Sequence, residues 1–155
     1  MRRQLADAAA TDAFAAEFGA RLPADMAGWL VLLEGELGAG KSSFARALIA
    51  ALGHTGPVPS PTYTLVEPYE LPGVTVYHID LYRVSSEEEL PFLGFGELDE
   101  GLRLVEWPER APALAGAADL VLRLSYSGAG RDAELTGLSA RGRALVAAME
   151  SQSLD

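Results

Sequence analysis

Apolar residues recur along the first third of the chain at two spacings, which predict a helix, a strand and a second helix. Over residues 11–22 the large apolar positions lie four apart, which predicts a helix that Thr11 caps. A continuous apolar run follows at residues 29–33 and predicts a strand buried on both faces. A second helical stripe covers residues 44–52, and Gly53 suits the end of that helix.

The rest of the chain carries shorter apolar runs, separated by glycine, proline and polar residues. Ser85 and Glu88 match a capping box, which predicts the start of a helix in an acidic segment. Residues 143–150 predict a closing helix. Strands are predicted at residues 62–66, 74–79, 102–105, 120–126 and 134–138. This alternation predicts an α/β fold, a three-layer sandwich whose central sheet is mostly parallel with antiparallel additions.

Composition and charge narrow the class of protein and its partners. The 155 residues are 49% hydrophobic, which suffices for one domain with its own core. The absence of cysteine excludes disulfides, thiolate metal sites and a cysteine nucleophile. No apolar run reaches the roughly 20 residues of a membrane span, and the N-terminus lacks the apolar core of a signal peptide, so we expect a cytoplasmic protein. The net charge of −10 argues against a broad surface patch for RNA.

One segment points to nucleotide binding. Residues 35–42 read Gly-Glu-Leu-Gly-Ala-Gly-Lys-Ser and match the P-loop pattern G-x-x-x-x-G-K-[ST], between a predicted strand and a predicted helix. Lys41 is the only lysine beside eleven arginines, and its compact ammonium suits the space between β- and γ-phosphates. The Ser42 hydroxyl is expected to ligate Mg²⁺. The loop residues expected to bind phosphate are Glu36, Leu37, Gly38, Ala39, Gly40, Lys41, Ser42 and Ser43.

A P-loop also needs an acidic partner for the metal, and two carboxylates are candidates. Asp80 and Glu106 each follow a predicted strand, so both are expected at the carboxyl edge of the sheet beside the phosphates. The sequence leaves open which of them lies closer to Mg²⁺. Thr62, in a Ser-Pro-Thr segment after the P-loop helix, is a candidate sensor of the γ-phosphate. His78 is interpreted as a packed strand residue.

Two absences bear on the nucleotide and its turnover. The sequence has no Asn-Lys-x-Asp segment, the usual device that reads guanine, and this favours adenine. No glutamine follows a D-x-x-G segment that would place it near the γ-phosphate to orient water. We therefore predict a Mg²⁺-dependent ATPase whose weak intrinsic activity is stimulated by partner contacts.

Four motifs occur in a fixed order along the chain. They are the P-loop, residues 60–67 (Ser-Pro-Thr-Tyr-Thr-Leu-Val-Glu), residues 78–83 (His-Ile-Asp-Leu-Tyr-Arg) and residues 106–109 (Glu-Trp-Pro-Glu). Together they closely resemble the TsaE family, also called the YjeE family, of small P-loop ATPases in bacterial tRNA threonylcarbamoyladenosine synthesis. The resemblance extends from residue 11 to residue 131.

The resemblance implies ATP and Mg²⁺ as ligands and the proteins TsaD and TsaB as partners. Those two proteins transfer a threonylcarbamoyl group to adenosine 37 of tRNA, and a TsaE protein supports their turnover without performing the transfer. The tRNA is then an indirect partner, and no membrane is involved. We expect a single nucleotide-binding domain of the P-loop NTPase-like class over residues 1–155, with residues 1–10 and 151–155 frayed.

The resemblance also assigns roles to residues at the matching positions. It implies that Lys41 binds phosphate, that Ser42 and Glu106 hold the metal, and that Asp80 acts in nucleotide handling or hydrolysis. It places Thr62 in a switch-like loop of the catalytic site. Further positions near the nucleotide are Thr11, Trp107 and Arg131.

Two other functions fit the P-loop. A small-molecule kinase has a similar size, but it needs an acceptor pocket and an arginine-bearing lid, and the sequence shows no clear lid. A nucleotide-gated binding module without catalysis is the third hypothesis. Asp80 and Glu106 argue against it, because holding phosphate needs no second carboxylate.

Overall fold

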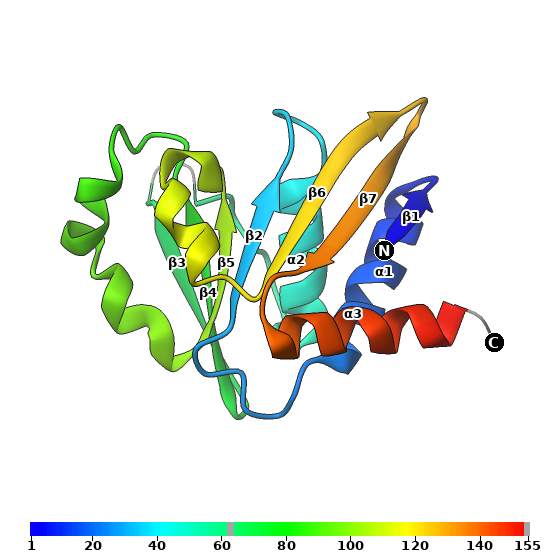
Figure 1. Ribbon diagram of the computed structural model, residues 1–155, viewed down its shortest axis with the longest axis horizontal. Helices are drawn as coiled ribbons and strands as arrows, with labels where there is room; N and C mark the ends of the chain where they lie inside the picture. Colours follow the sequence, from blue (N-terminus) through cyan, green and yellow to red (C-terminus); the bar gives the residue numbers. More distant parts are fainter. Residues whose placement is uncertain (62–63, 154–155) are drawn as a thin grey trace.

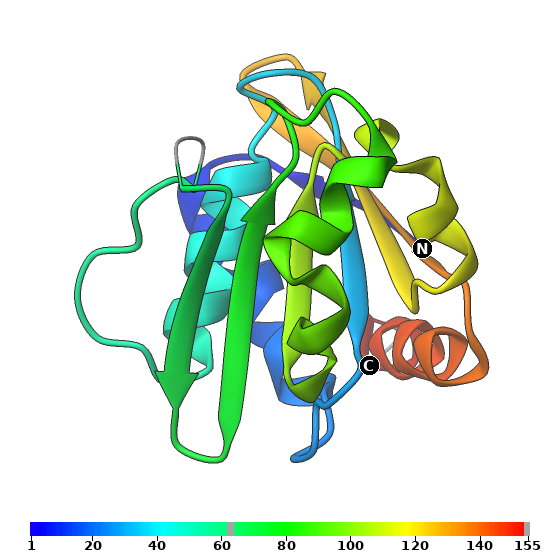
Figure 2. The ribbon, with the colours of Figure 1, turned by 90° about the vertical axis from the view of Figure 1, so that its left-hand side faces the viewer.

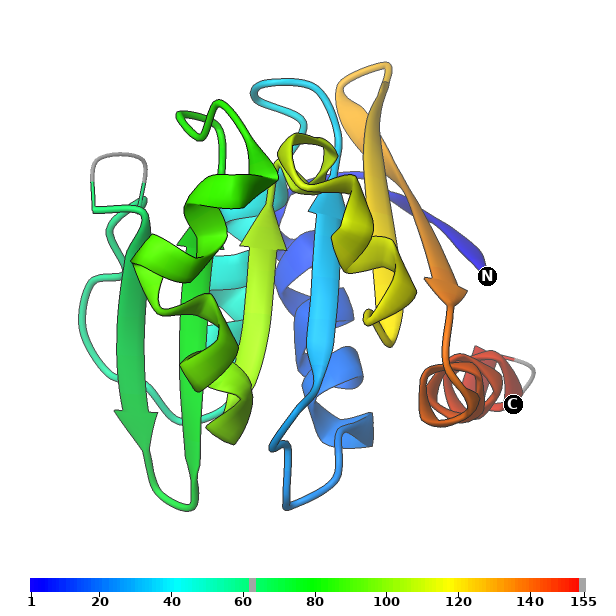
Figure 3. The same cartoon turned by 60° about the vertical axis from the view of Figure 1, so that its left-hand side comes forward.

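Seven strands form one mixed sheet in the computed structural model, which describes residues 1–61 and 64–153. The strand order is β1-β7-β6-β2-β5-β4-β3, and the sheet can be followed from β3 to β7 in Figure 3. The strands are β1 (Arg2–Leu5), β2 (Leu30–Glu34), β3 (Val66–Leu71), β4 (Val74–Asp80), β5 (Leu102–Glu106), β6 (Leu120–Ser127) and β7 (Gly130–Gly137).

The centre of the sheet is parallel and its flanks are antiparallel. Strands β6, β2, β5 and β4 pair in parallel through three ladders. The other three ladders, β1 with β7, β6 with β7 and β3 with β4, are antiparallel. The prediction of a mostly parallel sheet is therefore not confirmed. The physical reason is that the β3–β4 and β6–β7 hairpins pair antiparallel through short turns, and that the N-terminal strand β1 adds antiparallel to β7.

Helices cover both faces of this sheet. Figures 2 and 3 show α1 and α2 behind the sheet and the short 3₁₀ helices in front of it. Helix α3 packs against β7 and α1. Within the described ranges, no helix combines the length and the hydropathy that a membrane crossing requires. The helices are α1 (Ala8–Arg21), α2 (Lys41–Ala51), α3 (Ala140–Ser153), η1 (Glu87–Leu93), η2 (Phe95–Glu100), η3 (Pro108–Arg110) and η4 (Pro112–Gly116).

Two apolar cores form because strand residues alternate between the faces. On the α1/α2 side, Phe44 packs between Phe14 and Phe18, with ring centroids 5.8 and 5.6 Å away. On the opposite side, Ile79 and Val105 are buried under the 3₁₀ helices. The continuous apolar run predicted at residues 29–33 is confirmed as β2, a central strand that needs apolar residues on both faces.

Several predicted boundaries are corrected by local hydrogen bonds. The N-cap of α1 is Asp7, whose carboxylate accepts the N–H of Ala10 at 2.8 Å, so Thr11 lies inside the helix. The capping box lies one residue later than expected, at Ser86 and Glu89, and it begins a 3₁₀ helix. Strand β3 lies at Val66–Leu71 and shares only Val66 with the predicted range of 62–66, of which residues 62 and 63 lie outside the described residues. The proline of β3 is tolerated because β3 is an edge strand.

The N-terminus also differs from the expectation of a frayed segment. Residues Arg2–Leu5 form β1, which pairs with β7 so that Leu5 lies opposite Arg131. The N-terminal ammonium of Met1 donates to the carbonyl of Leu135 at 3.0 Å. Residues 2–5 are too few to give a clear strand pattern. Their structure is determined by long-range pairing with β7, which the sequence pattern does not show.

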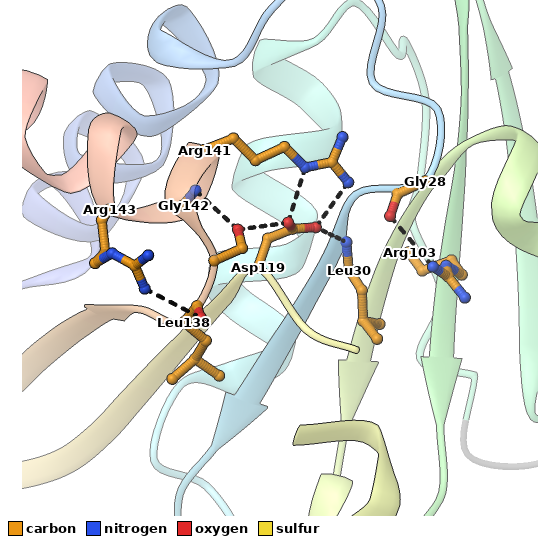
Figure 4. A network of polar contacts seen from close by, with 9 residues as sticks. Gly28, Leu30, Arg103, Asp119, Leu138, Arg141, Gly142 and Arg143 are labelled. Atoms are coloured by element: carbon orange, nitrogen blue, oxygen red, sulfur yellow. Dashed lines mark hydrogen bonds and ion pairs between the residues drawn. The ribbon is translucent and has the colours of Figure 1, made fainter. Parts of the chain in front are cut away.

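Asp119 ties the amino-terminal end of the sheet to α3 (Figure 4). Its carboxylate, 4% exposed, accepts from the Leu30 N–H at 3.0 Å, the Ser139 hydroxyl at 2.7 Å and the Arg141 guanidinium at 2.8 and 3.0 Å. Burial raises the pKa of this carboxyl, but the bonds from Arg141, Ser139 and Leu30 together outweigh it, so the pKa lies below the usual 3.8.

Replacing Asp119 by asparagine is expected to lower the free energy of unfolding by about 3 kcal/mol near neutral pH, because buried donors lose a charged acceptor. A folded-state pKa below the unfolded value means that the ionised carboxylate stabilises the fold above the unfolded pKa. This stabilisation is lost as pH falls through the folded pKa. The difference between wild type and Asp119→Asn should therefore be full above about pH 5 and shrink below pH 4 in urea titrations.

Asp132→Asn is the matched control, because Asp132 is an exposed acid on β7. It should change the free energy of unfolding by less than about 0.5 kcal/mol at either pH. An Asp119→Asn destabilisation that stays constant from pH 7 to pH 3 would contradict the role given to the ionised carboxylate.

Candidate functional site: a P-loop at the carboxyl edge of the sheet

The P-loop connects the end of β2 to the first turn of α2, at the edge where the parallel strands end (Figure 1). Gly35 has a φ of 151°, and a Cβ there would lie 2.4 Å from the Leu124 carbonyl oxygen, so only glycine fits. Gly40, with a φ of 110°, precedes α2 and offers no side chain to cap its first N–H groups. Those groups and the positive end of the helix dipole form a site for an anion.

Lys41 lies in the floor of this site. Its side chain is 5% exposed, its Nζ donates to the Gly35 carbonyl, and the ring of Trp107 lies 3.6 Å from that Nζ. Burial lowers the pKa of Lys41, and nearby carboxylates, Glu106 foremost, oppose that effect. Trp107 has φ 58° and ψ 51°, a left-handed conformation that costs a bulky residue about 1 kcal/mol or more.

Three polar side chains meet beside the loop. The Ser42 hydroxyl lies 2.9 and 3.1 Å from the two carboxylate oxygens of Glu106. His78 Nε2 lies 2.5 Å from Glu106 Oε2, and both side chains are almost fully buried, at 0% and 3% exposed. Ser42 comes from α2, Glu106 from the end of β5 and His78 from β4. The parallel pairing of β4 with β5 brings the last two together.

Asp80 stands beside Glu106 but bonds differently. The two residues are register partners at the ends of β4 and β5, as the strand-end argument predicts. Asp80 Oδ1 accepts the N–H of Tyr82 at 2.9 Å, and the residue is 4% exposed. The Ser42 hydroxyl is thus hydrogen-bonded to Glu106, while Asp80 borders the cavity beside the P-loop from the neighbouring strand.

The donor set matches Mg²⁺ held jointly by protein and nucleotide. Ser42 and Glu106 present three oxygens that converge within hydrogen-bond distance of one another. Mg²⁺ prefers oxygen ligands and is usually held by one or two protein groups together with phosphates and water. Among residues 1–61 and 64–153, no three His, Cys, Asp or Glu side chains cluster in a way that could hold a metal by themselves. The residues therefore fit a metal that arrives with phosphate.

Two neighbouring cavities flank the start of α2. The larger has a volume of 390 Å³, within the range of small-molecule sites, and the smaller has 180 Å³. Gly40, Ser43 and Arg131 border both, so the two cavities are contiguous around the P-loop. The other residues of the larger cavity are Leu37, Gly38, Lys41, Ser42, Arg46, Ser60, Asp80, Tyr82, Glu106 and Trp107.

Some predicted residues lie elsewhere than in the larger cavity. Thr11 borders the smaller one, and its hydroxyl lies 3.5 Å from the carbonyl of Asp7. Glu36 borders an open groove on the opposite side of the loop, and the side chain of Ala39 is fully buried. Thr62 lies outside the described residues.

Sequence reasoning missed the part that His78 plays in the site. A strand histidine two residues before Asp80 projects to the same face, and that spacing is the signal that it shares a site with the carboxylates. Arg46 and Tyr82 were also missed as cavity residues. Arg46 follows Ser43 by one helical turn and donates to its hydroxyl at 3.4 Å, so helical spacing could have found it.

Comparisons with known proteins show which proteins this chain is similar to. The family model described as "Threonylcarbamoyl adenosine biosynthesis protein TsaE" matches residues 5–133. The tRNA threonylcarbamoyladenosine biosynthesis protein TsaE of Haemophilus influenzae is 37% identical over 124 residues, which cover 79% of this chain and 78% of that protein. The protein of the same name from Synechocystis sp. is 40% identical over 116 residues, 71% of each chain. The crystal structure of YdiB from Bacillus subtilis has a TM-score of 0.78 at 24% identity, covering 99% of this chain and 95% of that one, and supports the fold alone.

Proposed function

The chain belongs to the TsaE family, and on that premise we propose that it binds Mg·ATP, hydrolyses it slowly and supports the threonylcarbamoyladenosine modification of tRNA. The observation that carries the nucleotide part is the convergence of Lys41, Ser42 and Glu106 at the N-terminus of α2. The pathway part rests on the names of the relatives, three of which match over more than two thirds of both chains.

The two cavities suggest how ATP lies. The phosphates occupy the larger cavity, where the loop N–H groups and the Lys41 ammonium neutralise their charge. Lys41 must leave the Gly35 carbonyl and the face of Trp107 to reach the β- and γ-phosphates. The ribose and adenine extend past Arg131 toward Thr11 in the smaller cavity.

In this proposal Ser42 and Glu106 would hold Mg²⁺, which would supply positive charge beside the phosphates. His78 fixes the Glu106 carboxylate by donating from Nε2, so that the other carboxylate oxygen remains directed at Ser42. Asp80 orients the attacking water from the next strand end. We also propose that Thr62 senses the γ-phosphate from the switch-like loop in which the family resemblance places it.

The partner proteins are TsaD and TsaB, and tRNA is met through them. The chain is a single P-loop NTPase-like domain, and its mixed sheet with helices on both faces is a variant of the three-layer sandwich of that class. We propose that the protein acts in the cytoplasm, where tRNA is modified. Its net charge of −10 favours docking on a basic protein surface over direct contact with tRNA.

A reconstituted modification reaction tests this function. TsaD and TsaB are incubated with tRNA and a threonylcarbamoyl donor, and modified adenosine is counted per TsaD molecule. We expect repeated turnover only when both this chain and ATP are present. A yield that is the same without the chain would contradict the proposed role. Consumption of ATP only when a small acceptor molecule is supplied would instead support a kinase.

A further inference from the structure

The tip of the β6–β7 hairpin lies beside the P-loop, and its side chains bond to three consecutive carbonyls of that loop (Figure 3). Tyr126 donates its hydroxyl to the carbonyl of Leu37 at 3.0 Å. Arg131 donates through its guanidinium to the carbonyls of Gly38, at 3.2 Å, and Ala39, at 3.0 Å. The hairpin thus holds the outer side of the loop.

These carbonyl contacts determine where the loop N–H groups point. In a planar trans peptide, the C=O of one residue and the N–H of the next point in opposite directions. Fixing the carbonyls of Leu37 and Ala39 toward the hairpin therefore turns the N–H groups of Gly38 and Gly40 away from it. Neither N–H donates to an acceptor within the described part of the chain, and both glycines border the nucleotide cavity. The third N–H, that of Ala39, is held inside the loop by Glu36.

The hairpin residues are themselves fixed in position. Tyr126 and Arg131 face each other across the β6–β7 ladder, and the tyrosine ring lies 4.4 Å from the guanidinium carbon. Arg131 also donates to the Gly130 carbonyl at 2.8 Å, and β1 pairs with β7 so that Leu5 lies opposite Arg131. The donors are therefore preorganised before any ligand binds.

Gly38 gives independent support. The P-loop pattern requires glycine at positions 35 and 40 but leaves position 38 free. Gly38 has a φ of 80°, and a Cβ there would lie 2.6 Å from the Tyr126 hydroxyl oxygen. The positive φ at residue 38 favours glycine, and without a Cβ there the Tyr126 hydroxyl can approach the loop closely.

We propose that Tyr126 is a positioning residue which, with Arg131, keeps the loop N–H groups directed at the nucleotide phosphates. Tyr126 is 51% exposed and borders the groove on the outer side of the loop, so it acts on the nucleotide only through the loop. The proposal rests on nucleotide binding at this loop.

Tyr126→Phe tests it, because the substitution removes the hydroxyl donor and keeps the ring on Arg131. We expect amide hydrogen exchange of Ala39, whose N–H is held by the Glu36 carbonyl inside the loop, to become about 2- to 10-fold faster in the nucleotide-free protein, the equivalent of one lost hydrogen bond. The KM for ATP and the dissociation constant for ADP should rise by a similar factor. The kcat should stay within about twofold, because Ser42 and Glu106 are not touched.

Tyr69→Phe is the matched control. The Tyr69 hydroxyl is buried on β3 without a hydrogen-bond partner among the described residues. Its removal should change neither loop exchange nor affinity. Unchanged exchange in Tyr126→Phe would overturn the proposal, and so would faster exchange with wild-type affinity for both nucleotides. If the wild-type protein binds neither ATP nor ADP, the proposed function fails. The exchange comparison alone then decides the role of Tyr126: faster exchange in Tyr126→Phe supports it, and unchanged exchange overturns it.

Discussion

Lys41→Met is expected to weaken the binding of ATP by about 100-fold, because two charge-assisted hydrogen bonds to phosphate oxygens are lost. Lys41→Arg should recover little of the affinity, since a planar guanidinium cannot enter the space that the ammonium occupies. The cavity around Lys41 is bounded by Trp107 on one side and the loop on the other. Isothermal titration with ATP measures both variants.

The same substitution should not destabilise the empty protein. Burial lowers the pKa of Lys41, so the folded state disfavours its charge, and an apolar side chain of similar length relieves that cost. We expect the Tm of Lys41→Met to equal or exceed that of wild type. Arg143→Met removes a remote positive charge on α3 and should bind ATP as wild type does. Wild-type affinity in Lys41→Met would refute the assignment of the loop as the phosphate site.

Glu106→Gln is expected to lower ATP hydrolysis by about 100-fold or more, since the carboxylate that holds the metal becomes a neutral amide. In the absence of Mg²⁺, the substitution should not weaken the binding of ATP. A negative charge beside the phosphates is removed, so binding should be unchanged or tighter. The increase in affinity that Mg²⁺ gives wild type should be lost in the variant. Titrations with and without Mg²⁺ separate these effects.

Asp80→Asn is the informative companion, because Asp80 and Glu106 are neighbours at the same sheet edge. Since the Ser42 hydroxyl bonds Glu106, we expect Asp80→Asn to keep the Mg²⁺ effect on affinity while hydrolysis falls. Loss of the Mg²⁺ effect in Asp80→Asn, with its retention in Glu106→Gln, would reverse the two assignments.

The parts of the fold that the sequence predicts well are those with a strong local pattern. The apolar run of β2, the P-loop and the stripe of α2 were predicted because each feature lies within a dozen residues. The N-cap at Asp7 was missed because Thr11 is also a capping residue type, and only the backbone shows which one is used. Strand β1 was missed because the strand that pairs with it, β7, lies near the other end of the sequence.

In the candidate site, too, residues in local motifs are predictable, whereas contacts that depend on the fold are not. Lys41, Ser42 and the two strand-end acids follow from the motif and from the rule that parallel strands end at one edge. The contact of His78 with Glu106 depends on the register between β4 and β5, and the contact of Tyr126 with Leu37 joins residues 89 positions apart. The spacing of His78 and Asp80 indicates only that both lie on one face of β4, so the structure was needed to find the two contacts.

Release of phosphate from ATP by the purified protein, alone and with TsaD and TsaB added, tests the account most directly. We predict slow release alone and clear stimulation by the two proteins together, with Glu106→Gln abolishing both rates. Release that is unaffected by TsaD and TsaB, or that persists in Glu106→Gln, would contradict a partner-stimulated ATPase built on this loop.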